Sequence, residues 1–321
     1  MKKSVFMLLI ILLIGLSLTC ANNPTVKHAG DLTETDGIKI GDFVDGKGTL
    51  VWRDEFEGDT LDTTKWNYET GVGIHYDASL WGWGNNERQY YTKDNTRVEN
   101  GMLIIEAEKH ASTPGAANYF SSRLTTAGVK DAVTGKVTRE KFVTPKTGYV
   151  EIRVKSPRGA GFWPGFCLLG ANCFGYSGFK KVFWPTCGEI DIFEANGAKL
   201  TSIAPAVHHG VSFPGRYWVK YKETTVEDMS ENYHVYGAGW DRSGIHFYIN
   251  GENAFSVPLP FPEEHEGGNS AAFYDGPGFG MIIWFAVGGN FLAGTVPDDS
   301  VFTSDDWEAR SLMVDWVRVY K

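Results

Sequence analysis

Short stretches of alternating apolar and polar residues, separated by turn signals, constrain the fold of this chain most strongly. Residues 149–155 and 245–249 alternate in this way, so each is expected to bury one face as a β-strand. The second stretch stops at Asn250-Gly251, a hairpin signal. Residues 281–287 are apolar on both faces, and residues 312–320 close the chain as a further strand. Many short strands at this spacing, with no long helical period, predict an all-β sandwich or jelly roll.

The composition fits a globular domain and narrows the kind of ligand. Of 321 residues, 38 are Gly, 14% are aromatic and only 21% are charged, which excludes a disordered chain, a coiled coil and collagen. The net charge is −9 with no run of Lys and Arg, which argues against nucleic acid as a partner. Abundant Trp and Tyr instead suit stacking on a neutral ligand.

The N-terminus has the pattern of an export signal. A basic start precedes residues 5–18, which are apolar or small throughout, a length typical of a signal peptide and short for a membrane span. The signal ends either at residue 21, with cleavage before Asn22, or before Cys20, which would then carry a lipid. Both alternatives predict export, as a secreted protein or a cell-surface or outer-membrane lipoprotein, with the lipid as the one membrane contact. Residues 22–48 are polar and aperiodic and are interpreted as a linker.

Three cysteines follow the signal segment, so at most one pair can form within the chain. Cys167 with Cys173 and Cys173 with Cys187 are the two pairings that we consider, and the sequence does not choose between them. A zinc site built from Cys173, Cys187, His208 and His209 lacks the close spacing of such sites.

The segment from Gly188 to Glu194 concentrates carboxylates in a strongly β-forming stretch. In a regular strand Glu189 and Asp191 share a face and Glu194 points the other way. A β-bulge at Ile192-Phe193 would keep the apolar residues in the core and return Glu194 to the face of Glu189. Two carboxyls about 5–5.5 Å apart are what retaining glycoside hydrolysis needs. The simpler alternative is a solvated acidic edge strand.

The surroundings of these acids carry a family resemblance. Residues 184–197 resemble the signature of glycoside hydrolase family 16, in its laminarinase (endo-β-1,3-glucanase) branch. Further segments match that family in the expected order, at residues 52–58, 83–92, 122–126, 148–157, 161–164, 233–236, 286–290 and 314–320. The resemblance covers residues 49–321 as one catalytic domain. It implies a jelly-roll β-sandwich of two antiparallel sheets, with a substrate cleft on the concave sheet.

The resemblance also implies roles for the three acids. Glu189 matches the nucleophile and Glu194 the acid/base, while Asp191 matches the middle carboxylate that holds their protonation states apart. One carboxyl has to be ionised and the other protonated, and the crowding of like charges raises one pKa. No cofactor is expected for this chemistry.

Six further residues resemble sugar-binding positions of the family. Indole rings suit the apolar face of a pyranose, and polar side chains bind its hydroxyls. Trp184 lies five residues before Glu189, on the opposite face by strict alternation, but Pro185 and Gly188 interrupt the strand and can let the indole overhang the cleft. The full set is Trp184, Trp163, Trp83, Asn86, Arg123 and His208.

A structural Ca²⁺ site is the remaining implication. Glu57, the carbonyl of Gly101 and Asp315 match the family's oxygen ligands on the convex face. Some residues depart from the family pattern, among them Arg88, Cys167 and Cys187, and they leave the linkage preference open.

The resemblance predicts a monomeric enzyme that hydrolyses β-1,3-glucan within the chain, with retention. Two alternatives stay within the family, namely a mixed-linkage β-1,3-1,4-glucanase and a galactan (agar-type) hydrolase. A third is a non-catalytic β-glucan-binding protein. The presence of all three acids favours the enzyme, and the runs at 83–87 and 286–290 favour glucan.

Overall fold

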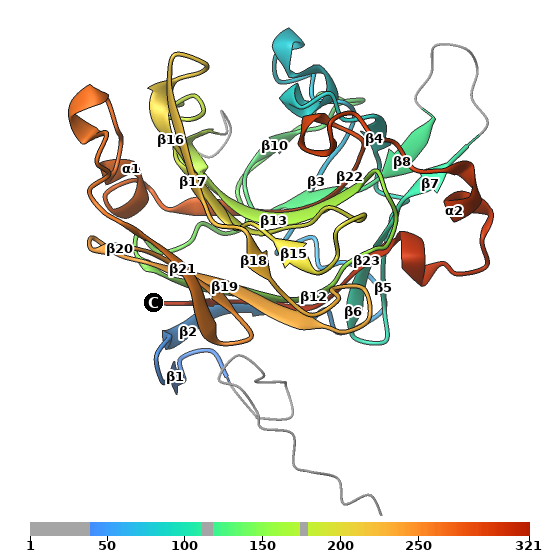
Figure 1. Cartoon of the computed structure of the whole chain (residues 1–321), viewed down its shortest axis with the longest axis horizontal. Helices are drawn as coiled ribbons and strands as arrows, with labels where there is room; N and C mark the ends of the chain where they lie inside the picture. Colours follow the sequence, from blue (N-terminus) through green and yellow to red (C-terminus); the bar gives the residue numbers. More distant parts are fainter. Residues whose placement is uncertain (1–38, 111–117, 174–178) are drawn as a thin grey trace, which may run out of the picture.

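Two curved antiparallel β-sheets stacked face to face form the body of the protein (Figure 1). The computed structural model describes residues 39–110, 118–173 and 179–321. The predicted signal peptide with Cys20, and most of the segment predicted as a linker, lie outside the described residues. Within the described part of the chain, no helix is long and apolar enough to cross a membrane. The predicted all-β sandwich is confirmed.

Within the described residues the convex sheet has nine strands and includes the C-terminal strand near its middle. Its first strand lies inside the segment 22–48 and pairs with the second, so the folded domain begins before the predicted boundary at residue 49. The strands run in the order β1 (Phe43–Val44), β2 (Gly48–Asp54), β23 (Ser311–Tyr320), β12 (Gly148–Lys155), β19 (His234–Trp240), β20 (Gly244–Ile249) and β21 (Glu252–Pro258), and β6 (Met102–Glu106) also pairs with β23 and with β5 (Thr96–Glu99).

The concave sheet has seven strands in the part of the chain that the structure describes, and one of its inner strands, β14 (Glu189–Glu194), carries the three acids. In order they are β17 (Arg216–Tyr221), β16 (Ala206–Ser212), β14 (Glu189–Glu194), β13 (Phe162–Gly170), β22 (Phe279–Val287), β9 (Arg123–Thr125) and β3 (Asn67–Glu69). Smaller pairings join β4 (Gln89–Tyr91), β8 (Tyr119–Ser121) and β7 (Glu108–Lys109), β10 (Val129–Lys130) and β11 (Val137–Thr138), and β15 (Ser202–Ile203) and β18 (Thr224–Thr225).

Short helical turns occupy the loops between the strands. They are η2 (Ala78–Gly84), η3 (Ala171–Cys173), η4 (Glu264–Glu266), α1 (Ala271–Tyr274), η5 (Asn290–Leu292), α2 (Asp299–Thr303) and η6 (Glu308–Arg310). Several of these loops rise around the open face of the concave sheet (Figure 1).

The main hydrophobic core fills the space between the two sheets. Strand β22 contributes to two clusters because it is apolar on both faces, as the sequence predicted. Met281, Ile283 and Phe285 join the core between the sheets. Ile282 and Trp284 point to the other face, where they form a second buried cluster on the open side of the concave sheet. This second cluster is the floor on which the candidate site lies.

The predicted β-bulge is present in β14. Consecutive residues of β13 pair with Phe193 and with Asp191, so Ile192 between them has no partner. Both Ile192 and Phe193 are buried in the core between the sheets. The extra residue shifts the alternation by one, which returns Glu194 to the open face that Glu189 occupies.

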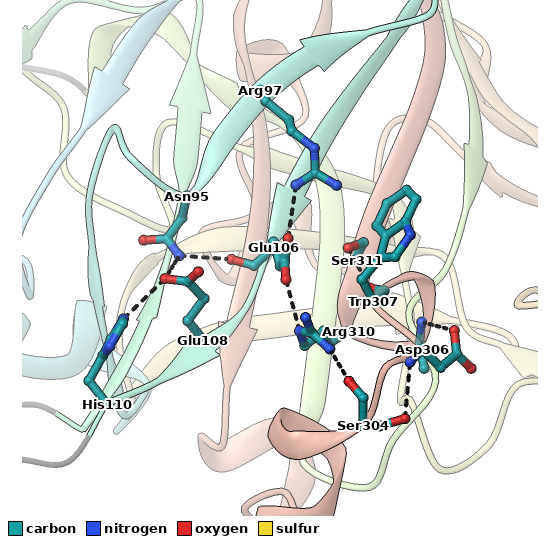
Figure 2. Close-up of polar contacts among 11 residues, drawn as sticks. Asn95, Arg97, Glu106, Glu108, His110, Ser304, Asp306, Trp307, Arg310 and Ser311 are labelled. Carbon is teal, nitrogen blue, oxygen red and sulfur yellow. Dashed lines mark hydrogen bonds and ion pairs between the residues drawn. The ribbon is translucent and has the colours of Figure 1, made fainter.

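A network of hydrogen bonds and ion pairs connects the segment just before β23 with β5 and β6 (Figure 2). The Glu106 carboxylate accepts hydrogen bonds from Arg97 and from Arg310, each at 2.8 Å. Asn95 donates to the Glu106 carbonyl at 3.1 Å, and the Arg97 guanidinium stacks over the Trp307 ring. Because β6 pairs with β23 next to these contacts, the network helps to set their register.

Candidate active site

Three carboxylates of β14 lie together on the open face of the concave sheet. The strand is held on both sides, by β13 and by β16, so its side chains have fixed positions. Asp191 is buried, with 3% of its surface exposed, whereas Glu189 and Glu194 are half-buried. Carboxylates this close in a poorly solvated site repel one another when all are ionised, which favours uptake of a proton.

Trp184 contacts Glu189 directly. Its indole Nε1 donates a hydrogen bond to Oε2 of Glu189 at 2.7 Å. The chain turns between these residues, and Gly188 N donates to Pro185 O at 3.0 Å while Gly188 adopts a φ of +80°. Strict alternation would place Trp184 on the core face, so the turn is what brings the indole to the acids, as the interruption at Pro185 and Gly188 predicted.

A neighbouring loop holds this turn in place. Asn269 donates through Nδ2 to the Thr186 carbonyl at 2.6 Å, and its Oδ1 accepts from Gly210 N at 2.6 Å. The turn therefore depends on β16 and on the loop before α1. The Phe273 ring lies so close to Gly188 that a Cβ there would approach it to 3.0 Å. Asn269 carries no sequence motif and was not predicted.

Trp163 holds the second glutamate. Its Nε1 donates to Oε1 of Glu194 at 2.9 Å. The sequence predicted Trp163 as a stacking platform for sugar, but the side chain is 5% exposed and its ring stacks on Phe291 with centroids 5.1 Å apart. This expectation is corrected: the indole face is covered, and the contact that Trp163 offers to the site is its N–H group.

His208 pairs with the middle carboxylate. Its Nε2 lies 2.9 Å from Oδ2 of Asp191, and its Nδ1 lies 2.5 Å from the hydroxyl of Tyr217. His208 stands directly opposite Glu189 in the pairing of β14 with β16. Tyr217, on β17, was not predicted, because a tyrosine in an edge strand gives no signal in the sequence.

Burial and the neighbouring Asp191 raise the pKa of both glutamates. Burial first, and then the charge of Asp191, raise the pKa of Glu189 to about 7 and that of Glu194 to about 8. The indole hydrogen bonds and the charge of His208 oppose this rise. Burial would lower the pKa of His208, but the charge and contact of Asp191 outweigh it and raise that pKa to about 9. Near neutral pH a protonated His208 therefore lies against Asp191, beside two carboxyls whose pKa values lie close to neutrality.

Arg123 on β9 and Trp83 in η2 form one unit. The Arg123 Nε lies 2.6 Å from Oε2 of Glu69, and its guanidinium stacks over Trp83 at 4.8 Å and over Trp284 at 5.9 Å. Trp83 also donates to the Gly71 carbonyl at 3.3 Å. Glu69 and Trp284 were not predicted as site residues. Glu69 lies in a strand of only three residues, and Trp284 lies in an apolar stretch that the sequence assigns to the core.

Asn86 lines a recess together with residues of the loop 289–294, and Phe291 of this loop stacks on Trp163. The Asn86 Nδ2 donates to Oδ1 of Asn290 at 2.8 Å. The recess has a volume of about 370 Å³ and is also lined by Trp81 and Arg88. Trp81 is 53% exposed, so a flat apolar surface and several polar groups face the solvent together.

The residues considered for calcium and zinc sites lie away from one another or have other partners. Glu57 is exposed, and the Asp315 carboxylate forms an ion pair with Arg153. The zinc set that its spacing already argued against does not assemble among the described residues, because the adjacent His208 and His209 point to opposite faces of β16. His209 is fully buried against Phe261, at 3.6 Å between ring centroids. It faces away from the acids.

The chain belongs to glycosyl hydrolase family 16. The model of this family, "Glycosyl hydrolases family 16", matches residues 84–264, which include all three acids of β14. The chain is 33% identical to glucan endo-1,3-beta-glucosidase A1 of Niallia circulans over 94% of its own length and 42% of that relative. It is 32% identical to a beta-glucanase of Rhodothermus marinus, over 85% of each chain.

A solved structure of the family supports the same fold. The endo-beta-1,3-glucanase of Pyrococcus furiosus superposes with a TM-score of 0.68 and 33% identity, over 88% of this chain and 98% of that one. The chain spans less than half the length of the Niallia circulans relative. The chain thus matches nearly all of the Pyrococcus furiosus structure but less than half of the Niallia circulans relative.

Proposed function

We propose that this family 16 protein hydrolyses β-1,3-glucan within the chain by double displacement with retention. One observation carries the proposal: two half-buried glutamates on a bulged strand each accept a hydrogen bond from their own indole, with Asp191 between them. Raised pKa values suit a pair in which one carboxyl is ionised while the other is protonated. The relatives named above act on β-1,3-glucan or β-glucan by name, which supports this substrate class.

In the first step, Glu189 and Glu194 act in opposite senses. The Glu189 carboxylate attacks the anomeric carbon while the protonated Glu194 gives its proton to the departing glycosidic oxygen. The bond between that carbon and oxygen breaks, and a covalent glycosyl ester forms on Glu189. Trp184 donates to the oxygen Oε2 of Glu189, so it positions the attacking carboxylate.

In the second step, water releases the sugar. The Glu194 carboxylate takes a proton from water, whose oxygen attacks the anomeric carbon and displaces Glu189. Two inversions give a product with the β configuration of the substrate. The charge of Asp191 raises the proton affinity of Glu194, and the charge of His208, which lies against Asp191, partly opposes this effect.

Aromatic surfaces lie on both sides of the acids. On the Trp184 side, the rings of Phe213 and Tyr217 lie 5.3 Å and 5.1 Å from the indole, and Phe213 is 61% exposed. On the Trp163 side lies the recess that holds Trp81 and Asn86. Because a bound chain can contact rings on both sides of the cleaved bond, this arrangement favours cleavage within a glucan rather than at its end.

The decisive experiment compares products from laminarin, lichenan and agarose, using the wild type and the variants Glu189→Gln and Glu194→Gln. We expect a ladder of oligosaccharides from laminarin, and a loss of several orders of magnitude in turnover for each variant while each variant remains folded. Preference for lichenan or agarose would favour the alternative substrates. Laminarin binding without turnover in the wild type would favour a glucan-binding protein.

We also propose a structural Ca²⁺ site from Glu57, the Gly101 carbonyl and Asp315. Strand pairing supports their proximity: Val314 pairs with Leu103, and Asp54 pairs with Val317, so all three positions lie near the same part of β23. Three oxygen donors suit Ca²⁺. Asp315 already pairs with Arg153, so an ion would share this carboxylate. Its role would be to tie β2 and β6 to β23, far from the reaction.

The export signal remains a proposal of the same kind. We propose that residues 1–21 direct export and that Cys20 is the lipid attachment site if cleavage occurs before it. Cell fractionation of the wild type and of Cys20→Ser tests this. Membrane association that Cys20→Ser abolishes supports the anchor, and equal release of both forms indicates secretion without a lipid.

A further inference from the structure

Three cysteine side chains lie around the start of the catalytic strand. Cys167 is on β13, Cys173 ends η3, and Cys187 is in the turn before β14. Their pairing was left open by the sequence. The proposed reaction uses none of these thiols.

The backbones that carry Cys173 and Cys187 are pressed together. Gly170 N donates to the Gly188 carbonyl at 3.0 Å. A Cβ at Gly170 would lie 2.1 Å from the carbonyl oxygen of Cys187 and 2.9 Å from its Cβ, so only glycine permits this approach. The chain then enters η3 at once, which places Cys173 near Cys187, and Cys173 together with burial raises the pKa of the Cys187 thiol.

Cys167 has a different environment. Its sulfur gathers with carboxylate oxygens of Glu189 and Asp191, all within 4.8 Å of one another. The side chain is 2% exposed and belongs to the cluster beneath the site. Two carboxylates beside this sulfur disfavour its thiolate, which is the form that attacks a disulfide.

We infer that Cys173 and Cys187 form a disulfide when the protein meets an oxidising environment, and that Cys167 remains a thiol. The pair is an oxidative modification site whose co-reactant is a small-molecule disulfide such as oxidised glutathione. Cys173 is partly exposed and Cys187 is only 2% exposed, so the co-reactant meets Cys173 first.

The exchange balances without any other reagent. The Cys173 thiolate attacks one sulfur of the small disulfide and releases one small thiol. The Cys187 thiolate then attacks the Cys173 sulfur of the mixed disulfide and releases the second small thiol. Two protein S–H groups are lost, one protein S–S bond forms, and both hydrogens leave on the two small thiols. The protein dithiol is oxidised and the small disulfide is reduced.

The cross-link would brace the turn that presents Trp184 to Glu189. It closes a loop of 15 residues, from 173 to 187 inclusive. A closed loop of this size lowers the entropy of the unfolded chain, and for a domain of this length the expected gain in melting temperature is about 5–10 °C. The brace acts on the folded state of the cleft and does not enter the reaction.

The test uses the full chain, oxidised with glutathione disulfide and then unfolded in an alkylating reagent without reductant. Peptide mass mapping should find residues 173 and 187 in one cross-linked pair and Cys167 alkylated, with the Cys20 peptide followed separately. Melting curves with and without dithiothreitol should differ by about 5–10 °C. Heated samples should keep more laminarin-hydrolysing activity in the oxidised form.

Matched variants separate the pairings. Cys187→Ser, and Cys187→Ala in case the serine variant folds poorly, should lose the effect of reductant on the melting temperature, whereas Cys167→Ser should retain it. A cross-link between residues 167 and 173, a stable mixed disulfide with glutathione at Cys173, or no oxidation at all would overturn the inference. These outcomes are read by mass, so they are distinct from any failure of the proposed hydrolytic function.

Discussion

Replacing Trp163 by Phe should move one limb of the pH–activity profile and leave the other in place. The indole Nε1 donates to Oε1 of Glu194 at 2.9 Å, and this bond favours the ionised carboxylate and so lowers its pKa. Phenylalanine keeps an aromatic ring to stack on Phe291 but has no N–H to donate. The pKa of Glu194 should therefore rise, and the acid should stay protonated to a higher pH.

The size of this shift follows from the geometry. A hydrogen bond to a charged group contributes about 1.5–3 kcal/mol, and one pKa unit corresponds to about 1.4 kcal/mol. The alkaline limb of kcat/KM, which lies near pH 8 if it reports Glu194, should thus move up by about one to two units. The acid limb, which reports Glu189 near pH 7, should stay close to its wild-type position.

Initial rates on laminarin from pH 4 to 10 measure both limbs, with a melting curve at each pH to exclude unfolding. Trp184→Phe removes the corresponding bond to Glu189, so it should move the acid limb upward instead. Trp284→Phe is the matched control, because its ring meets Trp163 edge-on at 6.4 Å within the same cluster. If Trp163→Phe moved the acid limb, or neither limb, the assignment of Glu194 as the acid would be refuted.

Three further outcomes are expected. The first sugar released should have the β configuration, and an NMR time course that shows the α-anomer first would contradict the two-step mechanism. Folding raises the pKa of Glu194, so the free energy of unfolding should be highest below the pKa of this group in the unfolded chain and should fall as the pH rises through its pKa in the folded protein. Glu194→Gln should therefore melt at a higher temperature than the wild type near pH 8, with little difference near pH 4. Calcium should raise the melting temperature of the wild type, and Glu57→Gln should abolish that rise. Glu57→Gln is a better test than Asp315→Ala, because Asp315→Ala also breaks the ion pair with Arg153. A wild type whose melting temperature does not respond to calcium would contradict the proposed calcium site.

Indole hydrogen bonds organise the candidate site more than open aromatic stacking does. Trp184 and Trp163 each donate to one glutamate, and they approach the pair from opposite sides of β14. The two bonds favour the charged form of each carboxyl, while burial and Asp191 favour the neutral form. The balance places both pKa values close to neutrality, where one carboxyl can attack and the other can donate a proton.

Local pattern was enough to predict the fold class and the catalytic strand. The alternation of residues 149–155 predicts a strand that is buried on one face, and the continuous apolar stretch 281–287 predicts a strand that is buried on both faces. Each pattern lies within a single strand, so it can be recognised without knowledge of the tertiary structure. The bulge was predictable for the same reason, since Ile192 and Phe193 cannot both be buried in a regular strand that also presents Glu189 and Glu194 together.

Only the tertiary structure decided which partners each acid has. Trp163 looked like an open platform, but Phe291, 128 residues later in the chain, covers its ring and leaves only the N–H for Glu194. Tyr217 and Asn269 were invisible to sequence reasoning because their contacts come from separate strands and loops. The burial of a strand face can be predicted from the alternation of residues within that strand. A hydrogen bond between segments far apart in the sequence depends on how the whole sheet curves and brings those segments together.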